Sequence, residues 1–324
     1  MGHRRGQSRG RASALPPGSQ LDLFSGTQGA AAPAKTGLEP VPARPEHVAL
    51  AGRLPKHLRM GGCTWSFPGW AGHVYDGQAS EAQLARFGLK AYAAHPLLRS
   101  VDVARTFYAP IDAQTFGEMA SQVPDDFRFT AKVPRAITHD AMLRDTGDAL
   151  AAFARAMEPL GEKLGPLLLQ MPAEFGRDET RHADLARFLA ATPGDVRLAL
   201  EFRSASWHVP EVVDLLRTHG VALAWTEWRE LPRCADVTAD FLYLRWLGDR
   251  RTIERYDRVQ VDRTTSFDTW EADLMRTFGE VREVYGYFNN HWAGHSPSSA
   301  NEMKRRLGLS VEEPRDHWTQ RELF

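Results

Sequence analysis

Two carboxylates follow short apolar stretches of the sequence and are the first candidates for chemistry. Glu201 ends an alternating apolar run, and Glu227 follows another. If these runs are neighbouring strands, the two carboxyl groups lie within about 5–9 Å, the range in which glycoside hydrolases pair an acid with a base. The alternative is structural: Glu227 is a loop carboxylate, and Glu201 forms an ion pair with Arg203, Arg245 or Lys132.

A third carboxylate and four cations occupy similar positions. Asp102 ends a further apolar run, and we count it among the candidate catalytic groups. The cations at predicted strand ends are Arg105, Lys132, Arg203 and Arg245. Guanidinium forks match phosphate oxygens, and the amides that open the helix after Ser296 would add to such a site. The sequence therefore predicts an anion site, with neutralisation of the carboxylates as the alternative.

Aromatic, amide and imidazole side chains at other strand ends would complete a ligand site. Indole rings offer flat faces on which sugars or bases stack. The Asn-Asn-His sequence before Gly294 is also typical of a turn and a helix cap. The further candidate substrate-binding residues are Trp65, Tyr108, Gln170, Trp207, Asn289, Asn290 and His295.

A metal site is the weaker alternative. The residue types that suit zinc or manganese are present at His139, Asp102, Glu201, His291 and His295. No His-Glu-x-x-His motif marks them, and the spacing of His291 and His295 falls on a loop, so it fixes no geometry. We therefore predict no cofactor and no metal ligands, and keep a divalent ion as an alternative.

The elements that must position these residues alternate regularly along the chain. Alternating strands and helices imply parallel strands with right-handed crossovers, and eight such units over about 250 residues are typical of a (β/α)₈ barrel. An open doubly wound sheet is the alternative, but no Gly-x-Gly-x-x-Gly follows the first strand. The predicted strands are 59–64, 99–103, 127–132, 166–170, 196–202, 221–226, 241–246 and 283–288. The predicted helices are 81–95, 112–122, 145–164, 179–191, 210–219, 266–280 and 296–307, with none in the gap 227–240.

Several strands have one mixed or polar face and one apolar face. Helices cover the outside of such a barrel, so the apolar faces should point outward and the mixed faces inward. The mixed faces carry Arg128, Thr130 and Lys132, then Arg197, Ala199 and Glu201, then Tyr243 and Arg245, then Tyr285, Tyr287 and Asn289. This pattern predicts polar side chains at the C-terminal mouth, where barrels of this kind place their active sites.

The ends of the chain are predicted as tails, with the barrel at 58–308. Residues 1–57 are rich in Gly, Pro, Ala and Arg, and we interpret them as disordered; the Arg-rich start is also compatible with a transit peptide. Within this tail, Gln20-Leu21-Asp22-Leu23-Phe24 resembles the pentapeptide that binds the bacterial sliding clamp, with Leu and Phe as groove anchors. The alternative is that these residues dock the tail on the domain. In the C-terminal tail, 309–324, the last five residues match at Gln320, Leu323 and Phe324 only.

Composition limits the function classes. Residues 1–59 carry nine Lys/Arg and three Asp/Glu, a balance of +6, and the remainder carries 31 and 38, a balance of −7. An acidic body argues against binding nucleic acid by bulk charge, but a local basic groove is compatible with it. Two distant cysteines, Cys63 and Cys234, suit a reducing cytoplasm, and no apolar run is long enough to cross a membrane.

Seven collinear segments resemble one family, the YecE-like family catalogued as domain of unknown function 72. They are GGCTWSFPGW (61–70), RTFYAP (105–110), VPDDFRFTAKVPRAITH (123–139), EPLGEKLGPLLLQMPAEF (158–175), LALEFRSASWH (198–208), LYLRWLGDR (242–250) and YGYFNNHWAGHSP (285–297). The resemblance implies a TIM-barrel-like fold and no established reaction. A distant likeness to barrels of the endonuclease IV type makes nucleic acid a suspected ligand. The chain departs from the family at 102–104, which lacks a Glu-Ile-Asn, and at 245–248, which lacks a histidine.

These observations leave three functions open. The first is an enzyme, such as a hydrolase, or a binding platform for a phosphate-bearing or nucleic-acid ligand at the barrel mouth, recruited to the sliding clamp. The second is a glycosidase-like hydrolase with paired carboxylates. The third is a non-catalytic accessory of DNA replication or repair.

Overall fold

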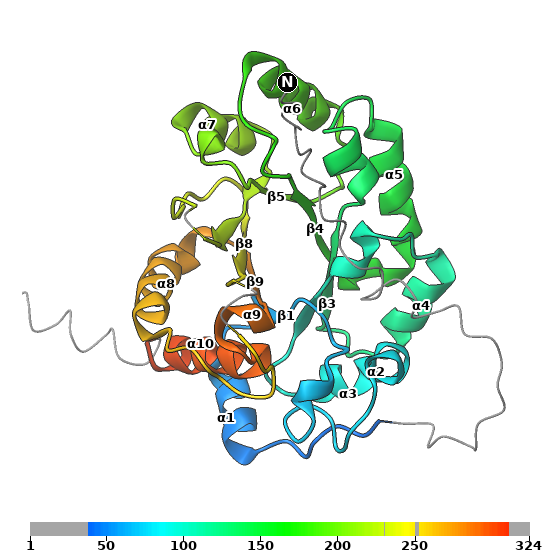
Figure 1. The fold of residues 1–324 in the computed structure, drawn as a ribbon, viewed down its shortest axis with the longest axis vertical. Helices are drawn as coiled ribbons and strands as arrows, with labels where there is room; N and C mark the ends of the chain where they lie inside the picture. Colours follow the sequence, from blue (N-terminus) through cyan, green and yellow to red (C-terminus); the bar gives the residue numbers. More distant parts are fainter. Residues whose placement is uncertain (1–37, 230, 250–252, 311–324) are drawn as a thin grey trace, which may run out of the picture. The chain divides into compact units, whose positions relative to one another are not determined.

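A single parallel sheet forms the centre of the computed structural model, which describes residues 38–229, 231–249 and 253–310 (Figure 1). Its strand order is β6-β5-β4-β3-β2-β1-β9-β8-β7, and every pairing between neighbours is parallel. The strands are β1 Leu58–Gly62, β2 Ser100–Val103, β3 Arg128–Lys132, β4 Leu164–Gln170, β5 Leu198–Glu201, β6 Ala222–Leu223, β7 Trp225–Glu227, β8 Phe241–Trp246 and β9 Glu283–Phe288.

The sheet closes into a barrel through one interrupted strand. β6 pairs with β5 and β7 pairs with β8, while Ala224 alone separates β6 from β7. The amide of Ala224 donates to the carbonyl of Leu200 at 2.9 Å, which keeps this stretch against β5. The stretch predicted as one strand, 221–226, is therefore the strand that joins the two edges of the sheet. The predicted (β/α)₈ barrel-like fold is confirmed.

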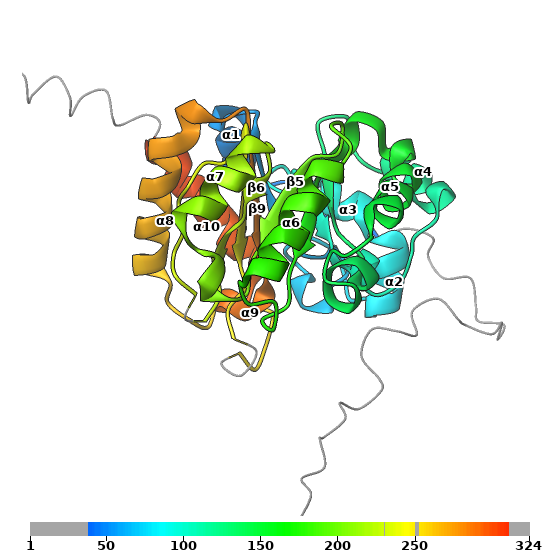
Figure 2. The same cartoon turned by 90° about the horizontal axis from the view of Figure 1, so that it is seen from above.

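Helices lie outside the strands, as Figures 1 and 2 show. They begin where the sequence offers caps: the Asp112 and Asp178 carboxylates accept from the amides of Thr115 and Arg181. The α-helices are α1 Pro45–Arg53, α2 Glu81–Phe87, α3 Leu89–Ala94, α4 Ala113–Ser121, α5 Gly147–Ala156, α6 Glu179–Ala191, α7 Pro210–Thr218, α8 Thr264–Thr277, α9 Asn290–Ala293 and α10 Ser296–Ser310. Short 3₁₀ or π turns are Pro68–Trp70, Ala104–Phe107, Ala136–Asp140, Glu158–Lys163, Ala205–Trp207 and Phe278–Glu280.

The helix predictions hold with small corrections. The stretch predicted as one helix at 81–95 is two helices that meet at Gly88, and the long helix predicted at 145–164 ends at Ala156 and continues as a 3₁₀ turn. The described residues of the gap 227–240 contain no helix, as expected. α9 follows β9 where the sequence suggested a turn and a helix cap, and Asn289 is its N-cap.

The strand faces divide as predicted. Inside the barrel, a small cluster of buried side chains includes Tyr243, Tyr285 and Tyr287, separate from the larger apolar core between sheet and helices. Polar groups among them are paired across the barrel: Thr130 bonds Tyr243 at 3.0 Å, and Ser100 bonds Tyr287 at 2.6 Å. The interior is thus a packed polar-aromatic layer, and an open site can lie only at its ends.

One expectation about the tail is wrong. Part of the segment predicted as disordered, 1–57, forms helix α1, whose Leu50, Ala51 and Leu54 are buried. Leu50 packs against Gly308 of α10, where an added Cβ would lie 2.6 Å from Leu50 Cδ1. The proline-rich composition hid this helix because Pro45 stands at its first position, where proline is tolerated. The clamp-like pentapeptide and the last five residues lie outside the described residues.

Among the described residues, no helix combines the length and the apolar character that a membrane crossing needs.

Candidate functional site

A buried ion network crosses the barrel just below its C-terminal mouth. Asp102 comes from β2, Glu201 ends β5, and Arg245 comes from β8. Arg245 Nη1 lies 2.8 Å from Glu201 Oε2, and Nη2 lies 3.3 Å from Asp102 Oδ2. Arg203, just after β5, donates its Nε–H to the other Glu201 oxygen. Because parallel strands deliver their carboxyl ends to one rim, residues far apart in sequence meet here.

The ion pairs decide the protonation of the two acids. Burial alone would raise the pKa of Glu201, but Arg203 and Arg245 outweigh burial and lower that pKa to about 2. Asp102 differs: burial raises its pKa, and the charge of Arg245 only partly opposes this. Glu201 is therefore a permanent carboxylate at neutral pH, with both oxygens already engaged.

The ion pairs that the structural alternative expected for Glu201 are present with Arg203 and Arg245, whereas its role as a general acid or base stays a prediction that this arrangement does not favour. An acid catalyst needs a pKa near the working pH, and this carboxyl is far below it. Its side chain has no exposed surface, so a substrate cannot reach it without breaking the network. The glycosidase-like reading loses one of its two carboxylates for the same reason.

Lys132 ends β3 beside this network. Burial, with the charges of Arg245 and Arg203, lowers the pKa of its amine to about 7, although Glu201 and Asp102 oppose the change. Its Nζ lies 3.6 Å from the centre of the Phe107 ring, a cation–π contact that favours the charged form. Lys132 therefore titrates near neutral pH and is only partly charged there.

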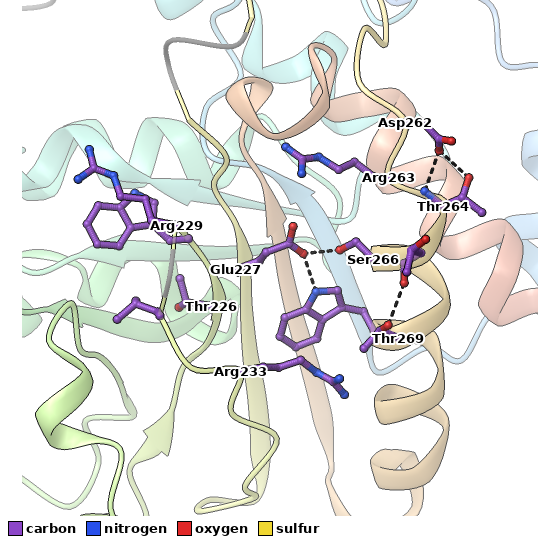
Figure 3. Close-up of a pocket in the computed structure, with 13 residues that line it drawn as sticks. Thr226, Glu227, Arg229, Arg233, Asp262, Arg263, Thr264, Ser266 and Thr269 are labelled. Atoms are coloured by element: carbon purple, nitrogen blue, oxygen red, sulfur yellow. Dashed lines mark hydrogen bonds between the residues drawn. The ribbon is translucent and has the colours of Figure 1, made fainter.

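Glu227 is fixed by three donors. Its Oε2 accepts from Trp270 Nε1 at 2.7 Å and from the Ser266 hydroxyl, and its Oε1 accepts from Trp292 Nε1 at 2.7 Å. Figure 3 shows the contacts of Glu227 with Ser266 and with the indole that lies below it. The carboxylate therefore joins the end of β7 to α8 and α9, and it orients two indole rings.

Two adjoining pockets lie around Glu227. One, of about 460 Å³, lies between the segment after β7 and the start of α8 (Figure 3). The other, of about 670 Å³, is lined by residues that follow β4, β5, β7 and β8, which places it at the barrel mouth. We call these two the mouth pockets. Residues shared by both are Glu227, Trp228, Arg229, Leu231 and Arg263.

Guanidinium groups and an indole ring dominate this surface. The Arg203 carbon Cζ lies 4.2 Å from the centre of the Trp228 ring, and that of Arg229 lies 4.6 Å from it. Arg263 donates to the Trp292 carbonyl at 2.8 Å and lies over the Trp292 ring at 5.5 Å. Arg229 is exposed and has a positive φ of 48°, a strained conformation for a non-glycine residue. The mouth thus presents cations beside a flat aromatic face.

The two tryptophans predicted to bind substrate are buried and hydrogen-bonded within the described structure. Trp207 is fully buried, stacks on Phe175 and Phe202, and donates Nε1–H to the Phe175 carbonyl at 2.6 Å. Trp65 is 7% exposed and donates to the Ala85 carbonyl. Both rings are buried in packing contacts, so this arrangement does not favour the substrate-binding role, which stays a prediction.

The remaining predicted residues divide by position. Asn289 caps α9 through the His291 amide, and buried Asn290 bonds Trp70 and the Ser296 amide, so both are caps as the alternative held. Gln170 donates to the Met171 carbonyl next to Glu201. Arg105 lies half-buried in the turn Ala104–Phe107, and Tyr108 after it is 60% exposed. None of these, nor His295, lines the mouth pockets among the described residues.

The described part of the chain contains no group of three or more His, Cys, Asp or Glu side chains arranged to hold a metal ion. The candidate ligands divide instead between different surroundings. Asp102 and Glu201 are paired with Arg245, His139 lies against Phe107, and His291 bonds Tyr256.

Sequence reasoning missed Arg229, Arg263, Ser266 and Trp270. All four come from the β7–β8 segment or from the start of α8, outside the strand ends on which the prediction concentrated. A signal existed in the run Trp225-Thr226-Glu227-Trp228-Arg229, where aromatic and charged residues alternate at the end of a strand. The residues from α8 had no comparable signal. α8 begins nearly forty residues after Glu227, and only the closure of the barrel brings the two together.

The comparisons with known proteins agree with the fold. A family model described as a protein of unknown function, DUF72, matches residues 59–322. The UPF0759 protein YecE of Escherichia coli (strain K12) is 33% identical over 139 residues, which cover 43% of this chain and 46% of YecE. The UPF0759 protein YunF of Bacillus subtilis (strain 168) is 26% identical over 271 residues, covering 74% of this chain and 93% of YunF. The match thus spans about half of YecE.

Solved structures show the same relationship. A DUF72 family protein from Thermotoga maritima MSB8 has 28% sequence identity and a TM-score of 0.65, and the match covers 77% of this chain and 98% of that one. Another from Enterococcus faecalis V583 has 22% identity and a TM-score of 0.64, covering 77% and 95%, a likeness that shows the fold alone. These descriptions name no ligand and no reaction.

Proposed function

This chain belongs to the DUF72 family, whose description names no activity, and from that premise we propose that its barrel mouth binds a phosphate-bearing ligand of the nucleotide type, free or within a nucleic-acid strand. The observation that carries the proposal is the lining of the 670 Å³ mouth pocket by Arg203, Arg229 and Arg263 together with Trp228. A guanidinium group can donate two parallel hydrogen bonds to the oxygens of a phosphate, and the face of an indole ring can stack on a nucleobase.

The charge at the mouth supports an anionic ligand. The charges of Arg203 and Arg245 are neutralised by ion pairs with the buried carboxylates of Glu201 and Asp102. Arg229, in contrast, is exposed and lies beside the Trp228 ring. The body of the chain is acidic overall, so attraction of a polyanion has to come from a local patch of this kind.

Binding, rather than hydrolysis, is the function that this arrangement favours. The pKa of Glu201 is lowered to about 2. Glu227 already accepts three hydrogen bonds, and those from the indoles orient Trp270 and Trp292. Glu201 is thus ionised at neutral pH and poorly suited to exchange protons with a substrate, and both oxygens of Glu227 are engaged by donors from α8 and α9. The mouth is therefore proposed as a recognition platform, and a carbohydrate hydrolase is the less supported alternative.

Arg229→Gln tests the proposal with little risk to the fold, because Arg229 is exposed. The probe is a fluorescein-labelled single-stranded DNA of about 12 nucleotides, followed by anisotropy at several salt concentrations. We expect weaker binding and a slope of log K against log salt reduced by roughly 0.7, the contribution of one phosphate contact. Arg217→Gln, at an exposed arginine on α7 that lines neither mouth pocket, is the matched control. Equal binding by wild type and both variants would contradict the proposal.

A second proposal concerns recruitment. The match of Gln20–Phe24 to the sliding-clamp pentapeptide favours it, with Leu23 and Phe24 as anchors. In a pull-down with purified bacterial clamp, the double variant Leu23→Ala, Phe24→Ala should lose binding while Leu15→Ala keeps it. A second double variant, Leu323→Ala, Phe324→Ala, tests the partial match at the C-terminus. Clamp binding that survives in the first variant would exclude this route.

A further inference from the structure

A second pocket, of about 430 Å³, lies in the helical layer between α1, α3 and the start of α10. It shares no lining residue with the mouth pockets. Four imidazoles line it: His47 and His95 have ring centroids 5.3 Å apart, and His73 and His295 have centroids 4.7 Å apart. We call it the histidine pocket.

Two of its side chains carry buried polar atoms that have no hydrogen-bond partner among the described residues. His295 is 1% exposed, and its Nδ1 lies 2.7 Å from the Ser298 hydroxyl oxygen and 3.3 Å from the Ser298 amide. Because an amide N–H can only donate, we assign Nδ1 as the acceptor and the ring proton to Nε2. That Nε2 has no acceptor, and Asn301 Oδ1 has no donor. A buried polar atom without a partner costs about 1–3 kcal/mol, so two in one pocket call for an explanation such as a ligand that pairs with both.

The surroundings of these atoms are positively charged. Arg44, Arg53 and Arg305 line the pocket together with Glu46 and Glu302, and Glu302 already accepts from Arg305. The pocket also lies at the N-terminal end of the 15-residue helix α10, whose dipole favours an anion there. The pocket thus brings three arginines and two glutamates together at a helix N-terminus, a lining with a net positive charge.

Burial and the positive surroundings lower the pKa of two of these imidazoles. Burial, together with the charges of His47, Lys304, Arg44 and His73, lowers the pKa of His95 to about 3. Burial and His73 lower the pKa of His295 to about 4, with Asp257 opposing them. Both rings are thus neutral near pH 7, and His295 offers a neutral N–H donor.

We propose that the histidine pocket binds a phosphate monoester of small-molecule size. A phosphate group accepts a hydrogen bond from His295 Nε2–H and charge-assisted bonds from the arginines. In its singly protonated form it also carries an O–H that donates to Asn301 Oδ1. The volume exceeds that of a phosphate alone and suits a sugar phosphate, since pockets for small ligands begin at about 300 Å³.

His295→Asn is the test variant. The amide oxygen of Asn can replace Nδ1 as the acceptor for Ser298, while the substitution removes the Nε2–H donor. The probes are ribose 5-phosphate, inorganic phosphate and free ribose, added to the full chain in isothermal titration calorimetry. Ribose 5-phosphate should bind with a Kd of about 1 mM or tighter, and His295→Asn should weaken it at least tenfold. His219→Asn, an exposed histidine at the end of α7, should bind as wild type does.

The mouth variant Arg229→Gln separates this proposal from the preceding one. If the histidine pocket holds the phosphate, Arg229→Gln leaves ribose 5-phosphate binding unchanged whatever it does to DNA binding. If inorganic phosphate binds as tightly as ribose 5-phosphate, the sugar makes no contact with the pocket, and the proposal that the ligand is a phosphate monoester is wrong. Absence of binding by wild type, or equal binding by wild type and His295→Asn, would overturn the site.

Discussion

Arg245 is the residue on which the buried charge of the barrel depends. Its guanidinium joins Asp102 and Glu201, which come from strands on different parts of the sheet. Strand alternation in the sequence placed Glu201 and Arg245 on inward faces, and an ion pair between them was one of the two readings it allowed. The sequence could not decide between pairing and catalysis, because that depends on side-chain reach across a barrel whose closure has no local signal.

Removal of the Glu201 charge should reveal how much this network contributes. In Glu201→Gln the shape is kept, but Arg203 and Arg245 lose a shared counter-charge in a buried setting. We expect the free energy of unfolding at neutral pH to fall by about 3 kcal/mol, as measured by urea titration. Glu162→Gln, on an exposed turn, should change it by less than about 0.5 kcal/mol. An equally small effect of both variants would show that the ion pairs add nothing.

The same pair of proteins tests the pKa of Glu201. A carboxyl whose folded pKa is lowered from 4.5 to about 2 contributes stability above pH 4.5 and loses it as the pH falls toward 2. Asp102, whose pKa is raised, acts in the opposite direction in both proteins. The stability difference between wild type and Glu201→Gln should therefore narrow between about pH 6 and about pH 3. A constant difference across that range would contradict the lowered pKa.

At the scale of elements, the connection from β8 to α8 shapes the mouth. Gly248 follows β8 with a φ of 67°, and a Cβ there would lie 2.0 Å from the His291 carbonyl oxygen. Only glycine allows this close approach of two backbone segments. Most strands and helices were predictable from alternation and caps. The β6–β7 interruption and helix α1 were not, because the former depends on neighbouring strands and the latter on burial against α10.

Helix α1 offers a direct test of its docking. Leu50 is buried against Gly308 of α10, whereas Val48 on the same helix is 52% exposed. Leu50→Ala should lower the free energy of unfolding by about 2 kcal/mol or more through loss of packing, measured by denaturant unfolding. Val48→Ala should lie within about 0.5 kcal/mol of wild type. Similar values for both variants would restore the view that this segment is a tail.

At the scale of the whole molecule, the two proposed binding sites lie on different parts of the described barrel. The mouth collects guanidinium groups and an indole from segments after β5, β7 and β8, and the histidine pocket lies in the helical layer near α1. Length and alternation were sufficient to predict the barrel, and a barrel implies a site at its C-terminal end. The composition of that site could not be predicted, since Arg229 and Arg263 lie on connections whose course is fixed only when all strands are closed.

The central claim is that the mouth pocket around Trp228 contacts a nucleotide-type ligand. It is tested most directly by photo-crosslinking the full chain to single-stranded DNA that contains 5-bromodeoxyuridine, followed by tryptic mapping. The account predicts crosslinks at Trp228, in the tryptic peptide 218–229 of the wild type. In Arg229→Gln, which lacks the cleavage site after residue 229, the corresponding peptide is 218–233, and its crosslinked fraction should be lower. Crosslinks confined to the basic segment 1–59, or spread evenly over the surface, would contradict it.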